Sequence, residues 1–376
     1  MDSKQEIRVV VVGDLHVKPD NIPDVRKYLE HLVNLLKQKE PTHIVLLGDT
    51  LHTHEIIHTV PLNEACSFIE TCSTFAHTYV LVGNHDMINC QQYLTRNHWL
   101  NSLKKWEGIT VVDKPILVEC HGIRMVMTPY TPNGTLVTAL TETLGEAWRT
   151  ADCIFAHQEF KGCKMGAIIS EHGDEWDPSW PLVVSGHIHV KQSPQENVYY
   201  TGSAMQTAFG EGEVNIVAVI EFTRELTDEG MVQSYSIEEV DFGLARKQII
   251  YQDVTDGSEA LLAKIRASAA PEKIKVALQG ASKAEFDAFK KTNEFKELAA
   301  SGARITFKPK KGPVGSRPSD DSAASSAASS AEMVTAGTDP DNEGVKFGQI
   351  LATLIRREGN ATLNELYRRL IDRSTA

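Results

Sequence analysis

The sequence has no long apolar run. No stretch of about 18 apolar residues, the length that a membrane-spanning helix needs, occurs among its 376 residues. The amino-terminal segment Met-Asp-Ser-Lys-Gln-Glu contains neither the basic region nor the apolar core of a signal peptide. We therefore expect no membrane contact and no secretion, and a location in the cytoplasm, or in the nucleoid or nucleus, depending on the host.

Cysteine is also scarce. The chain has six cysteines and no Cys-x-x-Cys pair. Such sparse use in a long chain fits free thiols in a reducing compartment better than a disulfide framework. The hydrophobic content of 41% is that of a globular protein. The length leaves room for a large catalytic domain with one or two small appendages.

Positive charge is rare in the first two thirds of the chain. Residues 1–245 contain 17 basic and 33 acidic side chains, whereas residues 246–376 contain 21 basic and 17 acidic ones. An acidic amino-terminal part is typical of a carboxylate-lined metal site and argues against tight nonspecific nucleic-acid binding by that part alone. The basic surplus of residues 246–311 is at least as compatible with a solvated surface as with a phosphate-binding patch.

Apolar runs and helical patterns alternate along the first 220 residues. The β-branched run Ile7–Val12, the helical spacing in 24–39 and the apolar run Ile44–Leu47 predict a strand, a helix and a strand. A helix over 64–76 continues this rhythm. Further strands are expected at Tyr79–Val82, Ile109–Val112, Ile116–Glu119, Arg124–Met127, Cys153–Ala156, Leu182–Ser185, Val198–Thr201, Ile216–Phe222 and Met231–Val240, the last two as a hairpin around Asp228-Glu229-Gly230.

The pattern divides the chain into four parts. Residues 1–245 are expected to form two sheets packed face to face with helices outside, and residues 246–311 a small αβ domain, with one helix over 283–300. Residues 312–344 are rich in Ser, Ala, Gly and Pro, as in a flexible linker. Residues 345–376 contain two short amphipathic helical patterns, the second with a capping-box signal.

Five short motifs follow the apolar runs of the first part. They are Gly13-Asp14-Leu15-His16, Gly48-Asp49-Thr50-Leu51-His52, Gly83-Asn84-His85-Asp86, His157 and Gly186-His187-Ile188-His189. An isolated His-x-His is more often a surface or core pair than a metal site. Five such motifs at strand ends supply enough Asp, Asn and His donors for two cations of the Mn, Fe or Zn kind.

These motifs, in this order and spacing, resemble those of the calcineurin-like metallophosphoesterase superfamily over about residues 7–222. The resemblance implies an αββα two-sheet sandwich and two divalent metal ions, Mn first, with Fe, Zn or Mg as alternatives. It assigns one ion to Asp14, His16 and His189. It assigns the other to Asn84, His157 and His187, with Asp49 bridging both.

The resemblance also implies catalytic side chains. His85 would act as general acid or stabilise the transition state, with Asp86 orienting its ring, and His52 belongs to the same set. An ordinary core histidine is the alternative for His85. The histidines outside the motifs are expected to be surface or helix-end residues, and His54 and His58 are expected to have no ligand role.

Details of the motifs favour one branch of the superfamily. His52 stands where purple acid phosphatases have a tyrosine ligand, and the arginine of serine/threonine phosphatases is missing after Asp49. Together with Asp86, the segments Tyr200-Thr201-Gly202-Ser203 and Phe209-Gly210-Glu211 resemble SbcD-type DNA repair nucleases. The resemblance implies a metal-dependent DNA exonuclease or endonuclease that acts in repair or recombination.

Two other functions stay open. A small-molecule phosphodiesterase or nucleotide phosphatase would use the same ligands, whereas a non-enzymatic scaffold would not need the full set that is present here. In residues 158–181, Lys161 or Lys164 is a candidate phosphate contact, and Phe160 or Trp176 a candidate for stacking on a base, with loop packing equally compatible.

SbcD-like nucleases carry a capping domain and then helices that bind a coiled-coil ATPase of the SbcC type. Residues 246–311 would be the capping-like domain, residues 312–344 the linker, and residues 345–372 the partner-binding helices. Short amphipathic helices are equally compatible with packing on their own chain or with a homodimer.

Overall fold

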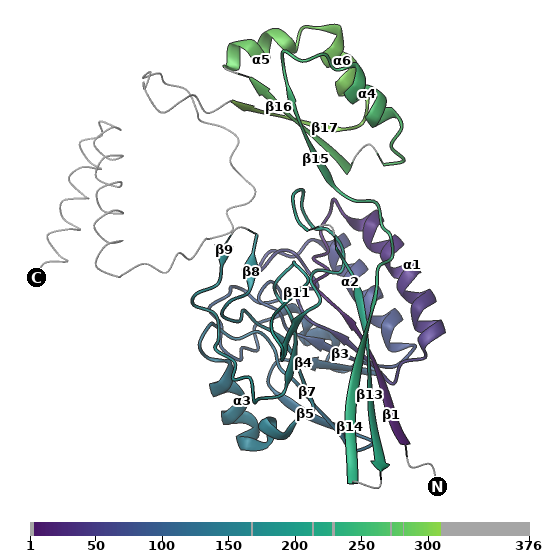
Figure 1. Ribbon diagram of the computed structural model, residues 1–376, viewed down its shortest axis with the longest axis vertical. Coiled ribbons are helices and arrows are strands. Elements are labelled where there is room, and N and C mark those ends of the chain that lie inside the picture. The colour runs from purple at the N-terminus through teal and green to yellow at the C-terminus, as the bar shows by residue number, and fades with distance from the viewer. Residues whose placement is uncertain are drawn as a thin grey trace, which may run out of the picture. The chain divides into compact units, whose positions relative to one another are not determined.

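A computed structural model describes residues 4–309, apart from 167, 213, 228–229, 271–272 and 281 (Figure 1). Contacts divide the chain into two compact units, Met1–Gly315 and Ser316–Ala376. The second unit lies outside the described residues. The predicted linker over 312–344 and the helices predicted within 345–376 therefore stay predictions.

The first sheet contains the amino-terminal strands in the order β14-β13-β1-β2-β3-β4. Strands β1 to β4 run parallel, β13 runs antiparallel to β1, and β14 runs antiparallel to β13. Two helices, α1 (Ile22–Lys39) and α2 (Thr59–Ser73), connect the first three parallel strands. The strands are β1 Lys4–Val12, β2 His43–Leu46, β3 His77–Leu81, β4 Ile109–Val112, β13 Val217–Thr227 and β14 Gly230–Val240.

The second sheet has the order β11-β12-β10-β7-β6-β5. Strands β6, β7, β10 and β12 run parallel, and the edge strands β5 and β11 are antiparallel to their neighbours. Helix α3 (Leu136–Leu144), which the periodicity did not reveal, lies between β6 and β7 in the chain. The strands are β5 Ile116–Cys120, β6 Ile123–Met127, β7 Cys153–His157, β10 Leu182–Gly186, β11 Gln192–Gln195 and β12 Val198–Tyr200.

The two sheets pack face to face, as predicted. Val9 and Val11 of β1 face Met125 of β6 and Phe155 of β7 in one buried cluster, whereas Val10 and its neighbours pack against α1 and α2. Strands buried on both faces explain the continuous apolar runs, since both side-chain rows face apolar neighbours. Each fully buried side chain of this size stabilises the fold by about 1.5–3 kcal/mol. The described residues form an α/β fold with two mixed sheets.

The small αβ fold follows the connection after β14. Its sheet has the parallel order β15-β16-β17, and its own core contains Val276, Leu278 and Phe289. Its elements are β15 Gln248–Asp253, α4 Glu259–Arg266, β16 Ile274–Gly280, α5 Lys283–Phe289, α6 Asn293–Ala300 and β17 Arg304–Pro309. Contacts place it in the same unit as the two sheets. The domain boundary at 245 stays a prediction.

The single helix predicted over 283–300 is wrong. The side chain of Thr292 accepts a hydrogen bond from the backbone N–H of Phe295 and starts α6, while α5 ends at Phe289. A threonine at this position caps a new helix because its oxygen satisfies an unpaired N–H group of the first turn. A helical apolar pattern alone does not reveal such a break.

Among the described residues, no helix is long and apolar enough to span a membrane.

Candidate metal centre

The five motifs converge because they follow parallel strands of both sheets. Asp14 and His16 follow β1, Asp49 follows β2, and Asn84 follows β3. From the second sheet, His157 ends β7, and His187 and His189 follow β10. The carboxyl ends of parallel strands meet at one edge of an open sheet, where ligands commonly bind. The structure brings all seven residues together.

A first group of donors consists of Asp14, His16 and His189, whose ligand atoms lie within 4.8 Å of one another. The Nε2 atoms of the two histidines are 2.9 Å apart. The Nδ1 atom of His189 faces a carboxylate oxygen of Glu211 at 3.0 Å, and this oxygen can only accept a hydrogen bond. The Nε2 atom of a neutral His189 ring therefore directs its lone pair into the group.

A second group consists of Asp49, His157 and His187. The Oδ1 atom of Asn84 lies 3.0 Å from Nε2 of His157 and 2.9 Å from Nδ1 of His187. The Nδ1 atom of His157 donates to the carbonyl oxygen of Leu47. Nε2 of a neutral His157 ring thus faces the oxygens of Asn84 and Asp49, an arrangement that a cation between them would stabilise.

Asp49 spans the two groups. Its Oδ2 atom lies 3.5 Å from Nε2 of His16, and its Oδ1 atom lies 3.3 Å from Nε2 of His157. Asp14 adds a buried Oδ2 atom that has no hydrogen-bond partner among the described residues. A buried carboxylate oxygen without a partner is costly unless a cation binds it. The Asp and His groups therefore fit a binuclear metal site.

The backbone is strained where it presents these donors. His16, Asp49 and His187 have positive φ angles of 47°, 48° and 76°, a region that side chains other than glycine rarely adopt. A Cβ atom added at Gly186 would lie 2.6 Å from Oδ1 of Asp14, and one at Gly83 would collide with Asp49. These two glycines allow the neighbouring loops to approach closely enough for their donors to share one site.

Burial and neighbouring charges shift the pKa values of the donors. Burial raises the pKa of Asp14, whereas the pKa of Asp49 falls well below its usual value because His157 and His85 outweigh its burial. Burial lowers the pKa of His187 to about 3, so its ring is neutral and able to bind a metal. The pKa of His157 rises to about 9 because Asp49 and Asp14 outweigh its burial. A proton on this ring and a metal compete for the same lone pair.

His85 lies beside both groups, with its ring centroid 4.8 Å from that of His16. Its backbone N–H donates to Oδ1 of Asp49 at 2.8 Å. Its Nδ1 atom donates to the carbonyl oxygen of His52 at 2.6 Å, so the proton on this nitrogen is fixed and Nε2 is left to exchange a proton with a bound molecule. The neutral ring is therefore the Nδ1–H tautomer, whose Nε2 accepts a proton, and the doubly protonated ring donates from Nε2.

The prediction that Asp86 orients the His85 ring is wrong. The buried Asp86 carboxylate accepts hydrogen bonds from the backbone N–H groups of Gly83 and Leu51 and from the indole N–H of Trp99. Asp86 thus fixes the turn that carries Asn84 and His85, because its oxygens satisfy the N–H groups of that turn. Its pKa is raised to about 6 by burial and by Asp49.

Two further histidines surround His85. Nδ1 of His52 lies 3.4 Å from Nδ1 of His16, and burial and the charge of Lys18 lower the pKa of His52 to about 4. The ring of His54 stacks on that of His85, with centroids 4.4 Å apart and an angle of 19°. For position 54 we predicted only that it has no ligand role, and the candidate metal-binding groups among the described residues do not include it. The His-x-His spacing of His52 and His54 was the sequence signal that could have indicated its place beside the site.

Glu211 is the second residue whose role the sequence did not reveal. Besides His189, its carboxylate accepts hydrogen bonds from the N–H and hydroxyl of Thr207 and from the N–H of Ala208. These hydrogen bonds fix both the carboxylate and the histidine ring. The Phe209-Gly210-Glu211 segment pointed to a branch of the family, but only the fold brings residues 189 and 211 together.

The loop over 158–181 does not supply the predicted stacking side chains. Phe160 is 1% exposed and Trp176 is 5% exposed, and both pack in the core beside Trp148. The ammonium group of Lys161 pairs with Glu175. The two aromatic rings stabilise the fold because burial removes them from water, and they present no free face to a base.

Comparisons with known proteins identify the family of the chain. The sequence model of the family described as calcineurin-like phosphoesterase matches residues 7–191. The chain is 38% identical over 309 residues to "Putative phosphoesterase 078R" of Invertebrate iridescent virus 3, covering 82% of this chain and 86% of that protein. It is 44% identical over 215 residues to "Putative phosphoesterase 244L" of Invertebrate iridescent virus 6, covering 57% and 76% of the two chains.

Among solved structures, the phosphoesterase Yfce from E. coli is 12% identical, with a TM-score of 0.30, covering 61% of this chain and 98% of that one. The two viral relatives are more informative, since their similarity extends over most of their own length. With its two groups of Asp and His donors at the strand ends, the chain belongs to the calcineurin-like phosphoesterase family.

Proposed function

We propose that the protein is a phosphodiesterase that uses two metal ions to hydrolyse nucleic acid, with DNA as the substrate. The observation that carries this proposal is the position of Asp49, whose two oxygens face the two donor groups. One ion would be held by Asp14, His16 and His189. The other would be held by Asn84, His157 and His187, with Asp49 shared.

Two divalent cations bound at these residues would offset the charge of a phosphate and lower the pKa of a bound water. The protein's own residues would do the rest. The carboxylates of Asp49 and Asp14 would supply negative charge to the cations at the two groups of donors. In its doubly protonated form, His85 would donate the proton on Nε2 to the oxygen that leaves phosphorus and keep the proton on Nδ1, which is bonded to the carbonyl of His52.

Nucleic acid is proposed as the substrate on the strength of the sequence. His52, Asp86 and the Phe209-Gly210-Glu211 segment resemble SbcD-type nucleases. In the structure, Glu211 of that segment contacts His189 and His52 contacts His16, so both branch-specific residues belong to the surroundings of the first donor group.

The deciding experiment offers substrates of three classes to the purified full-length chain in Mn²⁺. They are labelled single- and double-stranded DNA, a chromogenic nitrophenyl phosphodiester, and cyclic dinucleotides together with nucleoside monophosphates. We expect cleavage of DNA and of the nitrophenyl diester, abolished by EDTA. Turnover of small nucleotides without any cleavage of DNA would contradict the proposal in favour of a nucleotide phosphatase. Replacing Mn²⁺ by Fe²⁺, Zn²⁺ or Mg²⁺ would rank the metals.

A partner is proposed for the carboxyl-terminal segment. Residues 345–372 lie outside the described residues, and their helical apolar spacing favours binding in a partner's groove, as in an SbcC-like coiled-coil ATPase. Deleting them should spare metal content and cleavage of short DNA but abolish co-purification with such an ATPase. Cross-links to residues 1–245, or a change from dimer to monomer on deletion, would contradict a role in binding this partner.

A further inference from the structure

Two lysines converge on one backbone oxygen beside the metal centre. The Nζ atom of Lys18 donates to the carbonyl oxygen of Thr207 at 2.8 Å, and the Nζ atom of Lys247 donates to the same oxygen at 3.0 Å. Lys247 also donates to the carbonyl oxygen of Gln206. The two ammonium groups therefore lie within about 6 Å of each other, although like charges repel.

The two lysines come from distant parts of the chain. Lys18 follows His16 by two positions, and Lys247 lies in the connection between β14 and β15, where its backbone N–H donates to the side chain of Gln206. A sequence pattern does not reveal such a pair, because 229 positions separate its members. The pair exists only because this connection returns to the loop 206–211.

One residue joins this pair to the metal centre. The carbonyl of Thr207 accepts from both lysines, while its N–H and hydroxyl donate to Glu211, which in turn holds His189. The charge of Lys18 is also among the causes that lower the pKa of His52. Both ammonium groups thus lie at the edge of the first donor group.

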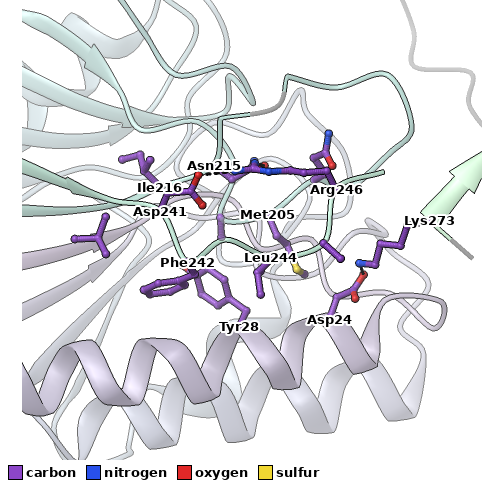
Figure 2. Close-up of a pocket in the computed structure, with 14 residues that line it drawn as sticks. Asp24, Tyr28, Met205, Asn215, Ile216, Asp241, Phe242, Leu244, Arg246 and Lys273 are labelled. Atoms are coloured by element: carbon purple, nitrogen blue, oxygen red, sulfur yellow. Dashed lines mark hydrogen bonds and ion pairs between the residues drawn. The ribbon is translucent and has the colours of Figure 1, made fainter. Parts of the chain in front are cut away.

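Carboxylates lie farther from this pair than from its neighbours. Lys273 forms an ion pair with Asp24, and Arg246 pairs with Asp241, at the pocket shown in Figure 2. Within the described part of the chain, Lys247 has no carboxylate within ion-pair distance. Lys18 has only Asp20, at 3.9 Å. The Glu211 oxygens are already committed to His189, Thr207 and Ala208.

The two lysines border an acidic part of the chain. Residues 1–245 contain 33 acidic and 17 basic side chains, so their overall charge repels a polyanion. Burial is the largest cause of the lowered pKa of Lys247; the charge of Lys18 adds to it, and the carboxylates of Asp24 and Glu211 oppose it. A bound anion would remove the repulsion between the two ammonium groups, since each ammonium has protons left to donate.

We propose that Lys18 and Lys247 bind a second phosphate of the substrate, adjacent to the phosphodiester that is cleaved. The inference rests on the proposed function and deepens it, because a substrate must then carry at least two phosphates to use the whole site. It favours an oligonucleotide over a cyclic mononucleotide or a nucleoside monophosphate. The competing explanation is that the two lysines only fix the loop 206–211.

The test compares three dinucleotides that differ in one phosphate. TpT contains only the scissile phosphodiester, whereas pTpT and TpTp add a phosphate on one side or the other. For the wild-type chain with Mn²⁺, kcat/KM should rise about 10- to 100-fold for one of the two, the size of a charge-assisted hydrogen bond. In Lys18→Gln/Lys247→Gln this gain should disappear.

A variant with the same change in charge is the control. Lys27→Gln/Lys105→Gln also removes two positive charges, from exposed side chains. It should keep the gain from the second phosphate. The inference is wrong if the gain survives in Lys18→Gln/Lys247→Gln. It is also wrong if that variant loses metal and cleaves all three dinucleotides equally poorly, because the two lysines then only fix the loop 206–211.

A binding measurement separates this inference from the proposed function. In EDTA, a fluorescein-labelled hexathymidylate is titrated with the wild-type chain and with both double variants, and anisotropy gives the Kd. Only Lys18→Gln/Lys247→Gln should bind about 10-fold more weakly, with a log–log salt dependence shallower by about 0.7 for each phosphate that the variant no longer binds. This result without DNA cleavage would contradict the nuclease and support the phosphate site. Equal binding by all three proteins would overturn the site, whatever their activity.

Discussion

Two α/β regions of this chain have similar parallel strands but different strand ends. In the two-sheet region, strained residues follow β1, β2 and β10, and the residues after these strands and β3 direct Asp, Asn and His side chains to one place. In the small fold, Asp253 ends β15 and its carboxylate accepts hydrogen bonds from Thr255 in its own turn. Among the described residues, every candidate metal-binding group lies in the two-sheet region.

The difference teaches that two opposed sheets, rather than parallel strands as such, create the site. The β1 to β3 ends supply Asp14, Asp49 and Asn84, and the second sheet supplies His157 and His187 from the other side. A single three-stranded sheet presents donors from one direction only. Packing two sheets surrounds a cation with ligands, which tetrahedral or octahedral coordination requires.

The largest expected effect comes from breaking the shared ligand. Asp49→Ala should reduce bound metal from about two equivalents and abolish hydrolysis, because both donor groups lose a partner. Asp253→Ala, at the corresponding end of β15, should leave metal content and activity unchanged. Metal analysis and a nitrophenyl diester assay measure both. Full activity of Asp49→Ala would refute the assignment of two metals.

A second substitution separates chemistry from metal binding. His85→Asn should retain metal and lower DNA cleavage by a factor on the order of 100 or more, since a proton donor at the leaving oxygen is removed. A nitrophenyl ester, whose leaving group needs little protonation, should be affected much less. Equal losses on both substrates would argue against general-acid catalysis. Loss of metal would make His85 a ligand.

A change at Glu211 tests a residue that contacts a donor, His189, without belonging to a donor group. Glu211→Ala should weaken metal binding about 10- to 100-fold, because the His189 ring loses the partner that fixes its orientation. Glu211→Gln should recover part of the affinity, since its side-chain oxygen still accepts a hydrogen bond. Metal titration followed by calorimetry distinguishes the two variants. Glu196→Ala, an exposed carboxylate in the second sheet region, is the control.

The stacked ring of His54 should contribute less to DNA cleavage than His85 does. His54→Ala should lower DNA cleavage about 2- to 10-fold without loss of metal, the value of one aromatic contact that positions His85. His54→Phe should retain most of the activity because it preserves a flat ring, and His58→Ala should behave as wild type. If His54→Phe is as impaired as His54→Ala, the imidazole nitrogens rather than the stacking account for the effect.

The smallest effect on chemistry is expected from the small fold. Leu278→Ala should lower the free energy of unfolding by about 2–5 kcal/mol, because Leu278 is fully buried in its core. Metal content per folded chain should stay the same, since the fold contributes no donor. Denaturant unfolding followed by circular dichroism measures the first quantity. Loss of metal at low denaturant would show that the small fold supports the donor groups.

The sequence by itself determined the strands and the donors. Continuous β-branched runs such as Ile7–Val12 form strands because their side chains pack on both faces of a buried sheet. The motifs that contain Asp14, Asp49, Asn84 and His157 each follow such a run, and the family resemblance assigned these residues as ligands. Local patterns suffice to place the motifs at strand ends, since strand and loop alternate over short distances.

Only the tertiary structure decided how distant side chains meet. Asp86 follows His85 in the sequence but binds the backbone of its own turn, while the carbonyl of His52 orients the His85 ring. Phe160 and Trp176 carry the right chemistry for stacking on bases, yet the core of the second sheet buries both. Glu211 and the pair of Lys18 and Lys247 depend on contacts between segments far apart in the chain. Such contacts follow from how the sheets and their connections pack, which residue spacing along the chain does not encode.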